Sequence, residues 1–94
     1  MKGFEWDDDK ATRNLRTHDV GFDEAATAFN DPARVELLDE SHSDEEPRYA
    51  IIGFSNAGRL LFVIFTMRHN VTRLISARKA NKKHQSIYEK ENKV

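Results

Sequence analysis

The most apolar part of the chain lies between Arg48 and Arg78 and consists of short runs of valine, isoleucine, leucine and phenylalanine. Asn56-Ala57-Gly58 and His69-Asn70 interrupt these runs, and both contain residue types that are typical of tight turns. The pattern predicts three antiparallel strands joined by two hairpins. Because Leu60 to Phe65 is apolar on both faces, this strand is expected at the centre of the sheet.

The two turns also predict which residues face each other. Gly58 suits the left-handed position of a three-residue loop. The resulting pairs are Ser55–Arg59, Phe54–Leu60, Ile52–Phe62 and Ala50–Ile64. A second hairpin that turns through His69 to Thr72 would place Arg68 opposite Arg73. Two like charges directly across a ladder are unfavourable unless water or an anion lies between them, so this pair is the first indication of a site.

The segment before the sheet predicts a short edge strand and two helices. Phe4-Glu5-Trp6 alternates as an edge strand does, and Asp7 to Asp9 can cap a helix that runs from about Asp8 to about Thr17 and closes near Asp19. The apolar face of this helix is expected to consist of Ala11, Leu15 and His18, with Lys10, Arg13 and Arg16 on or beside the solvent side. A second helix, based on Phe22, Ala25, Ala26 and Phe29, ends before Asn30-Asp31-Pro32.

The remaining segments complete an α+β fold with two N-terminal helices, an antiparallel sheet of about four strands and a C-terminal helix. Val35 to Leu38 predicts another strand, and the acidic stretch from Asp39 to Pro47 predicts an exposed loop. After Arg78, a stripe formed by Ala80, His84, Ile87 and Tyr88 predicts a basic amphipathic helix. The tail from Glu89 to Val94 has little to bury and is expected to fray.

Composition and charge limit the possible functions. The length of 94 residues corresponds to one small domain, 1–94. The chain has no cysteine, no signal peptide pattern and no apolar run of membrane-spanning length, so we expect a cytoplasmic protein. The net charge of −1 combines about −9 through Glu46 with about +8 from Pro47 onward. The basic half is typical of a polyanion binder, although the two halves could also neutralise each other in the fold.

Ordered motifs along the chain resemble one known family. They are Phe4-Glu5-Trp6-Asp7 with Lys10 and Asn14, His18-Asp19-Val20, Phe22, Glu24, Ala25, Phe29-Asn30-Asp31-Pro32, Arg48, Ile52-Gly53, Gly58-Arg59-Leu60-Leu61, Thr66, Arg68, Arg73 to Arg78, Ala80 and Tyr88. This set resembles the BrnT toxins of bacterial type II toxin–antitoxin systems, which belong among the RelE-like ribonuclease toxins. The family usually has Gly where Asp19 stands and Ser where Gly21 stands. Both departures concern helix ends rather than chemistry.

The resemblance implies an activity and a partner. It implies a RelE-like fold and an endoribonuclease that arrests growth by cutting cellular RNA without a metal ion and without a cofactor. It also implies a cognate antitoxin of the BrnA type, whose DNA-binding domain would allow the toxin–antitoxin complex to repress its own promoter. Contact with DNA would then come only through the antitoxin, and the symmetry of operator binding favours a higher-order toxin–antitoxin assembly such as a dimer of pairs.

Metal-free RNA cleavage needs a base for the 2′-OH, cations for the phosphate and a donor for the leaving oxygen. The candidate catalytic residues are Arg59, Arg68, Arg78, His18 and His69, and the candidate RNA-binding residues are Lys10, Arg48, Arg73, Lys79, Lys82, Lys83 and Tyr88. The arginines could instead be ordinary strand-end charge or be paired with the acidic half of the chain. The lysine run could be a solvated helix face, and His18 and Tyr88 could be packed side chains. His42 and His84 are expected to be incidental. The acidic runs lack the spacing of a calcium loop, and no histidine pair has the spacing of a zinc site on a helix.

A second function class fits the same composition. A non-catalytic module that binds nucleic acid or a protein partner would also need only the charge asymmetry and a small core. A directly DNA-binding repressor is disfavoured, because the sequence shows no helix-turn-helix with a base-reading second helix.

Overall fold

The sheet is built mainly from the apolar runs between Arg48 and Arg78. The structure, a computed structural model, describes residues 3–39 and 46–93. Its elements are β1 (Phe4–Glu5), α1 (Asp8–His18), α2 (Phe22–Thr27), the short 3₁₀ helix η1 (Ala28–Asn30), β2 (Val35–Asp39), β3 (Arg48–Phe54), β4 (Leu60–Arg68), β5 (Val71–Lys79) and α3 (Lys82–Glu91). The strand order is β1-β5-β4-β3-β2, with β1 parallel to β5 and the other neighbours antiparallel. The α+β class is confirmed, but the sheet has five strands rather than about four and is mixed.

The β3–β4 hairpin has the predicted register. Phe54 faces Leu60, Ile52 faces Phe62 and Ala50 faces Ile64, while the Ser55 N–H donates to the Arg59 carbonyl at 2.9 Å (N···O). Gly58 has a φ of +75°, the left-handed conformation that the three-residue loop requires. β4 lies at the centre of the sheet, as its two apolar faces predicted.

The predicted register of the β4–β5 hairpin is wrong. His69 and Asn70 alone form the turn, with φ values of +50° and +64°, so Arg68 faces Val71 and Arg73 faces Thr66. A two-residue turn with two left-handed residues matches the twist of the flanking strands better than a longer loop does. The like-charged pair of Arg68 and Arg73 is therefore not directly opposed. A β-bulge follows between Ile64 and Phe65 and leaves Ile75 without a partner on β4.

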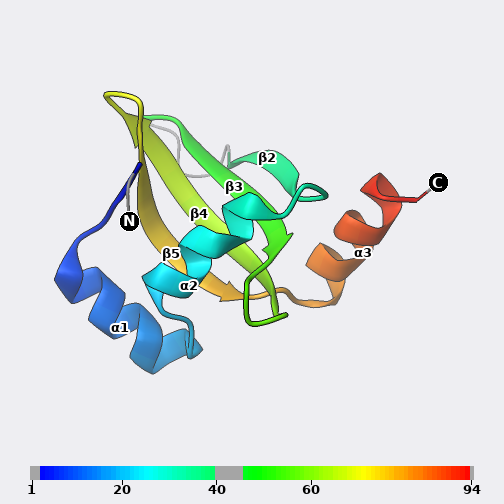
Figure 1. Cartoon of the computed structure of the whole chain (residues 1–94), viewed down its shortest axis with the longest axis horizontal. Helices are drawn as coiled ribbons and strands as arrows, with labels where there is room; N and C mark the ends of the chain where they lie inside the picture. The colour runs from blue at the N-terminus through cyan, green and yellow to red at the C-terminus, as the bar shows by residue number, and fades with distance from the viewer. Residues whose placement is uncertain (1–2, 40–45, 94) are drawn as a thin grey trace.

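The two faces of the sheet carry different helices (Figure 1). α1 and α2 cover one face, and the buried core lies between them and β3, β4 and β5. The core residues are Val20, Phe22, Ala25, Ala26, Ala28, Ile51, Leu61, Val63, Phe65, Leu74 and Ala77. Because side chains alternate along a strand, the residues between these core positions point to the other face. That face carries Arg48, Arg68, Arg73 and Arg78, and we call it the arginine face.

α3 packs on the arginine face near the β3–β4 hairpin. The ring of His84 stacks on Phe62 with centroids 4.0 Å apart, and Tyr88 meets Phe54 edge to face at 5.4 Å. The prediction that Glu89 to Val94 frays is wrong for the described part, because α3 continues to Glu91 and the Asn92 side chain donates to the Ala33 carbonyl at 2.9 Å. Of the predicted 39–47 loop, Asp39 ends β2 and residues 40–45 lie outside the described residues.

α1 begins and ends as predicted but buries a different face. Asp7 caps it, and Asp19 closes it in the left-handed conformation at a φ of +58°. Leu15, predicted to face the core, is 53% exposed, whereas Asn14 is buried. The reason is the short β1 strand, which pairs only with Thr72 and Arg73 of β5. Backbone N–H and C=O groups on the remaining edge of β5 need hydrogen-bond partners. At Ala77, the side-chain amide of Asn14 provides both of them.

Candidate functional site

Arg68 of the arginine face binds the carboxylate of Glu46, and two further arginines act on it electrostatically. Arg68 contacts Glu46 through both ends of its guanidinium, with Nη2 2.9 Å from Oε1 and Nε 3.2 Å from Oε2. These hydrogen bonds from Arg68 are the main reason that the pKa of Glu46 lies below its usual value, and the nearby charges of Arg48 and Arg73 act in the same direction. Arg73 also contacts Glu5 of β1, at 3.3 Å between Nη1 and Oε2. Anion-binding groups therefore cluster where β3, β4 and β5 meet the segment before β3.

A groove of about 400 Å³ lies between α1 and the arginine face. Its lining residues are Lys10, Arg13, Asn14, Thr17, His18, Arg48 and Ile75. Three candidate residues from the sequence, Lys10, His18 and Arg48, thus lie together although they come from opposite halves of the chain. His18 is half-buried, and the lining contains three cationic side chains and no carboxylate. Such a groove attracts a polyanion and places an imidazole beside it.

Arg13 belongs to this groove and is missing from the candidates that the sequence provided. The spacing of the apolar residues of α1 predicted a position on or beside the solvent side for Arg13, because that spacing takes no account of the polar residues of the helix. The polar residues Lys10, Asn14, Thr17 and His18 recur at helical spacing and share a face with Arg13. This polar stripe is a signal that could have found it.

Arg78 lies farther along the arginine face, toward α3. Its guanidinium carbon is 5.6 Å from the centre of the Phe62 ring, and Arg78 is separated from Arg73 by about 17 Å along β5. His84 is buried under this cluster, where its Nδ1 accepts from the Asn81 N–H and completes a capping box. Burial first, and then the charges of Arg78 and Lys83, lower the pKa of His84. His84 therefore has a structural position, while the exposed Lys82 and Lys83 extend the positive surface.

Arg59 lies apart from the groove and from Arg68. Its guanidinium is bound to the Glu24 carboxylate, with Nε 3.0 Å from Oε2, and to the Asp19 carbonyl at 2.9 Å. The hydrogen bond from Arg59 is the main reason that the pKa of Glu24 is lowered. Arg59 and Arg68 stand at opposite ends of β4, about 30 Å apart, so they cannot hold the same phosphate group. Lys79 is also near this cluster, 3.8 Å from Asp19.

His69 and Tyr88 lie outside the groove as well. His69 is exposed in the β4–β5 turn. The Tyr88 hydroxyl donates to the Asp31 carboxylate at 2.8 Å, and its ring packs against Phe54. Burial first, and then the hydrogen bond to Asp31, raise the pKa of Tyr88 to about 12. These contacts agree with the alternative interpretation from the sequence, in which Tyr88 is a packed side chain rather than an RNA-binding one.

The raised pKa of Tyr88 predicts a loss of stability in alkali. Its protonated form is favoured in the fold, so this contribution is complete below the ordinary pKa of 10.0 and is lost as pH rises toward about 12. We expect Tyr88→Phe to lower the free energy of unfolding by about 1 kcal/mol at neutral pH. The difference from the unsubstituted chain should narrow between pH 10 and 12 in urea titrations. A difference that stays constant over this range would contradict the assignment.

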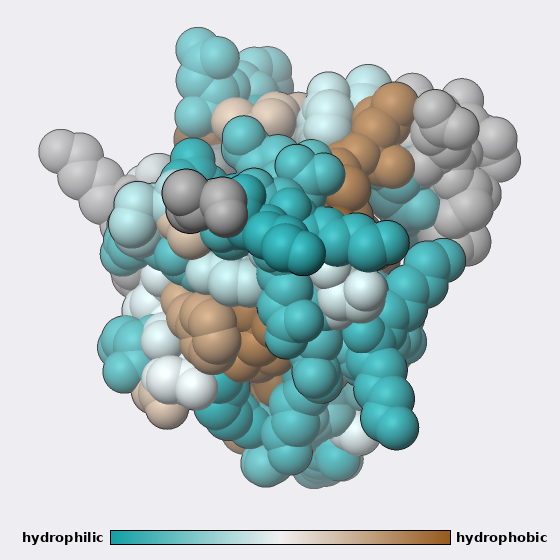
Figure 2. Space-filling model, turned by 90° about the vertical axis from the view of Figure 1, so that its right-hand side faces the viewer, coloured by the Kyte–Doolittle hydropathy of each residue, from teal (hydrophilic) through white to brown (hydrophobic). Residues whose placement is uncertain are grey.

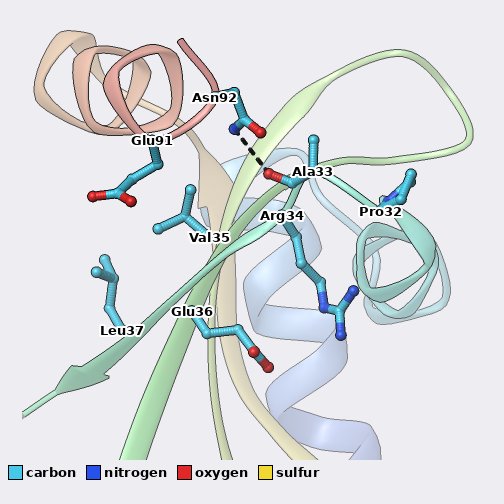
Figure 3. A pocket seen from close by; sticks show the side chains of 8 residues that line it. All are labelled: Pro32, Ala33, Arg34, Val35, Glu36, Leu37, Glu91 and Asn92. Carbon is cyan, nitrogen blue, oxygen red and sulfur yellow. Dashed lines mark hydrogen bonds between the residues drawn. The ribbon is translucent and has the colours of Figure 1, made fainter. Parts of the chain in front are cut away.

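A second groove, also of about 400 Å³, borders the outer edge of β2 (Figure 3). Val35 and Leu37 point toward α3, and Arg34 and Glu36 point the other way. Glu91 lies opposite Val35, so the lining is mixed in charge rather than basic. Figure 2, which looks onto the side of the molecule that holds α3, shows apolar patches bordered by hydrophilic residues. The groove beside α1 is therefore the better candidate for binding a polyanion.

The described residues contain neither a metal-binding cluster nor a membrane-spanning helix. Within residues 3–39 and 46–93, no group of three or more His, Asp or Glu side chains is arranged to hold a metal ion. In the same part of the chain, no helix is long and apolar enough to cross a membrane.

Comparison with known proteins identifies the family. The sequence model described as "Ribonuclease toxin, BrnT, of type II toxin-antitoxin system" matches residues 6–84. The chain belongs to this BrnT family. The match includes every residue that lines the groove beside α1, as well as Glu46, Arg68, Arg73 and Arg78. Tyr88 lies beyond it. No curated protein matches the chain.

A solved structure has a similar fold. The crystal structure of the Brucella abortus ribonuclease toxin BrnT matches with a TM-score of 0.62 and 22% sequence identity, over 84% of this chain and 96% of that chain. The resemblance to BrnT toxins that the sequence motifs suggested is thus confirmed by the family match and by the fold. The family is one of ribonuclease toxins, which implies an RNA target and an antitoxin partner.

Proposed function

We propose that this chain is a metal-independent endoribonuclease that cleaves cellular RNA in the groove between α1 and the arginine face. The observation that carries the proposal is that Lys10, His18 and Arg48 line one groove. Cleavage of RNA by its own 2′-OH requires a proton acceptor beside cationic groups. The groove offers both within a single concave site.

The roles follow from the chemistry of each side chain. His18 takes the proton of the 2′-OH as that oxygen attacks phosphorus, and the bond from phosphorus to the 5′ oxygen breaks. Lys10 and Arg48 stabilise the negative charge that accumulates on the phosphate oxygens in the transition state. The leaving 5′ oxygen takes a proton from water, and His18 later returns the 2′-OH proton to the solvent. The products are a 2′,3′-cyclic phosphate and a 5′-hydroxyl.

The other candidate residues have supporting roles in this proposal. Arg68, Arg73 and Arg78 bind neighbouring phosphates along the arginine face, and Lys79, Lys82 and Lys83 guide RNA electrostatically. Arg59 joins the α1–α2 connection to the β3–β4 hairpin through Glu24 and Asp19, which is a structural role. Tyr88 packs α3 onto Phe54 and Asp31.

Cleavage of purified single-stranded RNA in excess EDTA tests the proposal. We expect the isolated chain to produce new 3′ ends that carry 2′,3′-cyclic phosphate, which mass spectrometry identifies. Cleavage that disappears with EDTA and returns with a divalent ion would contradict the metal-independent mechanism. Intact RNA, together with a folded far-UV spectrum and RNA binding, would instead favour the non-catalytic module.

We further propose that a BrnA-type antitoxin neutralises the chain in the cytoplasm by covering the arginine face, and that the complex represses its own operon. A partner that binds a basic, half-apolar face inhibits and stabilises at the same time. The RNA assay tests this as well, because an equimolar antitoxin should abolish cleavage. Full cleavage by a complex that is shown to be intact would contradict coverage of the site.

A further inference from the structure

Glu46 makes contacts with Arg68 that resemble those of a phosphate. Its two carboxylate oxygens accept from Nη2 and Nε of Arg68 at 2.9 and 3.2 Å. This fork geometry is the one in which a guanidinium binds either a carboxylate or a phosphate. Arg48 and Arg73 are close enough to act on the same carboxylate. A negative group therefore already lies where the charges of three arginines converge.

A second carboxylate, that of Glu5, forms an ion pair with the neighbouring Arg73. Arg68 and Arg73 lie on the same face, because Arg68 pairs with Val71 and Arg73 with Thr66. Glu5 of β1 contacts Arg73 at 3.3 Å. Arg68 and Arg73 are thus both engaged by glutamates from the acidic half of the chain.

The ion pair between Glu46 and Arg68 can open to let another anion bind Arg68. The side chains of Arg68 and Glu46 are 47% and 40% exposed, respectively. An ion pair exposed to this degree is worth little and breaks readily. Glu46 also lies outside β3, two residues before its first residue, and is not part of the core. Its side chain can therefore leave Arg68 without displacing any residue of the core.

We propose that Glu46 occupies a phosphate subsite of the arginine face, and that RNA binds there by displacing its carboxylate from Arg68. This inference rests on the proposed function, since it names a subsite and an internal competitor on the face that binds RNA. A single phosphate must compete with a carboxylate that the chain itself holds beside Arg68. A strand with several phosphates gains further contacts at Arg48 and Arg73, so Glu46 selects for a polynucleotide over a single nucleotide.

Equilibrium binding of an uncleavable RNA tests this proposal. The probe is a fluorescently labelled single-stranded RNA with 2′-O-methyl groups at every position, and the variants are Glu46→Gln and Glu89→Gln. Both substitutions remove one negative charge, but Glu89 is an exposed residue of α3, whereas Arg48, Arg68 and Arg73 belong to β3, β4 and β5. We expect Glu46→Gln to tighten binding by about two- to five-fold and Glu89→Gln to have a smaller effect.

A double substitution distinguishes competition between Glu46 and RNA for Arg68 from the general effect of removing one negative charge. In an Arg68→Gln background, Glu46→Gln should no longer tighten binding, because its competitor role requires Arg68. A gain that persists without Arg68, or an equal gain from Glu89→Gln, would overturn the proposal. RNA that binds the unsubstituted chain but is unaffected by Glu46→Gln would also overturn it, while leaving the proposed function intact. Folded chains that neither bind nor cleave RNA would overturn both.

Discussion

His18→Asn is expected to lower the rate of RNA cleavage by about 100-fold or more, whereas His69→Asn should leave the rate within a few-fold of the original. The two substitutions are chemically identical, and only the position differs. His18 lies in the groove with Lys10 and Arg48, where an imidazole can exchange a proton beside the cations that we propose to hold the phosphate. His69 is exposed at the tip of the β4–β5 hairpin. Asparagine tolerates the left-handed conformation of this turn, so His69→Asn preserves the backbone.

Single-turnover cleavage, measured with RNA binding and thermal unfolding, separates chemistry from folding. The assignment of His18 as the proton acceptor requires that His18→Asn still binds the uncleavable RNA and remains folded at the assay temperature. Equal losses from both histidines would contradict the placement of the site in the groove. An unchanged rate for His18→Asn would exclude His18 as the proton acceptor and make Lys10 the next candidate base in the groove.

The sheet could be predicted because its determinants are local. The apolar runs were sufficient to locate β3 and β4, and Gly58 in a three-residue loop was sufficient for their register. The β4–β5 register depended on whether His69 and Asn70 would both adopt left-handed conformations. Both two-residue and longer turns are compatible with that sequence, and the error of placing Arg68 opposite Arg73 followed from this choice.

The candidate site could be predicted only as a set of residue types. Arg59 and Arg68 look alike in the sequence, since each lies at one end of the central strand. Their difference arises from partners distant in the sequence, because Arg59 is bound to Glu24 and Asp19, and Arg68 to Glu46. No periodic pattern of residues in the sequence indicates which carboxylate pairs with which arginine. The groove likewise requires α1, the start of β3 and Ile75 of β5 to meet, and that meeting depends on the tertiary fold.

The orientation of α1 shows where an apolar pattern misleads. Leu15 fits the apolar face by spacing, yet it is exposed, and the polar Asn14 takes the buried position. Burying a leucine there would leave the free edge of β5 without hydrogen-bond partners, and unsatisfied backbone groups cost more than one exposed leucine. The resulting rotation of the helix is what brings Lys10, Arg13 and His18 toward the arginine face.

Asn14→Ala is accordingly expected to be the most destabilising of the substitutions considered, lowering the free energy of unfolding by about 3 kcal/mol. The Asn14 side chain donates to the Val20 and Ala77 carbonyls at 2.8 Å each and accepts from the Ala77 N–H at 3.1 Å. Alanine would leave all three buried backbone groups without these partners. Urea titration measures the change, and Asn30→Ala, at an exposed position, should stay within about 0.5 kcal/mol of the original.

Asn14→Asp tests the hydrogen-bonding explanation against simple loss of volume. Aspartate has nearly the same shape and can still accept from the Ala77 N–H, but its carboxylate would face the two carbonyls to which Asn14 donates. If the hydrogen bonds matter, Asn14→Asp should be at least as destabilising as Asn14→Ala at neutral pH, and protonation in acid should recover part of the loss by restoring a donor. If only volume mattered, Asn14→Asp would be nearly neutral. Because the same side chain lines the groove and fixes α1 to β5, the hydrogen bonds that stabilise the fold also position the proposed catalytic groups.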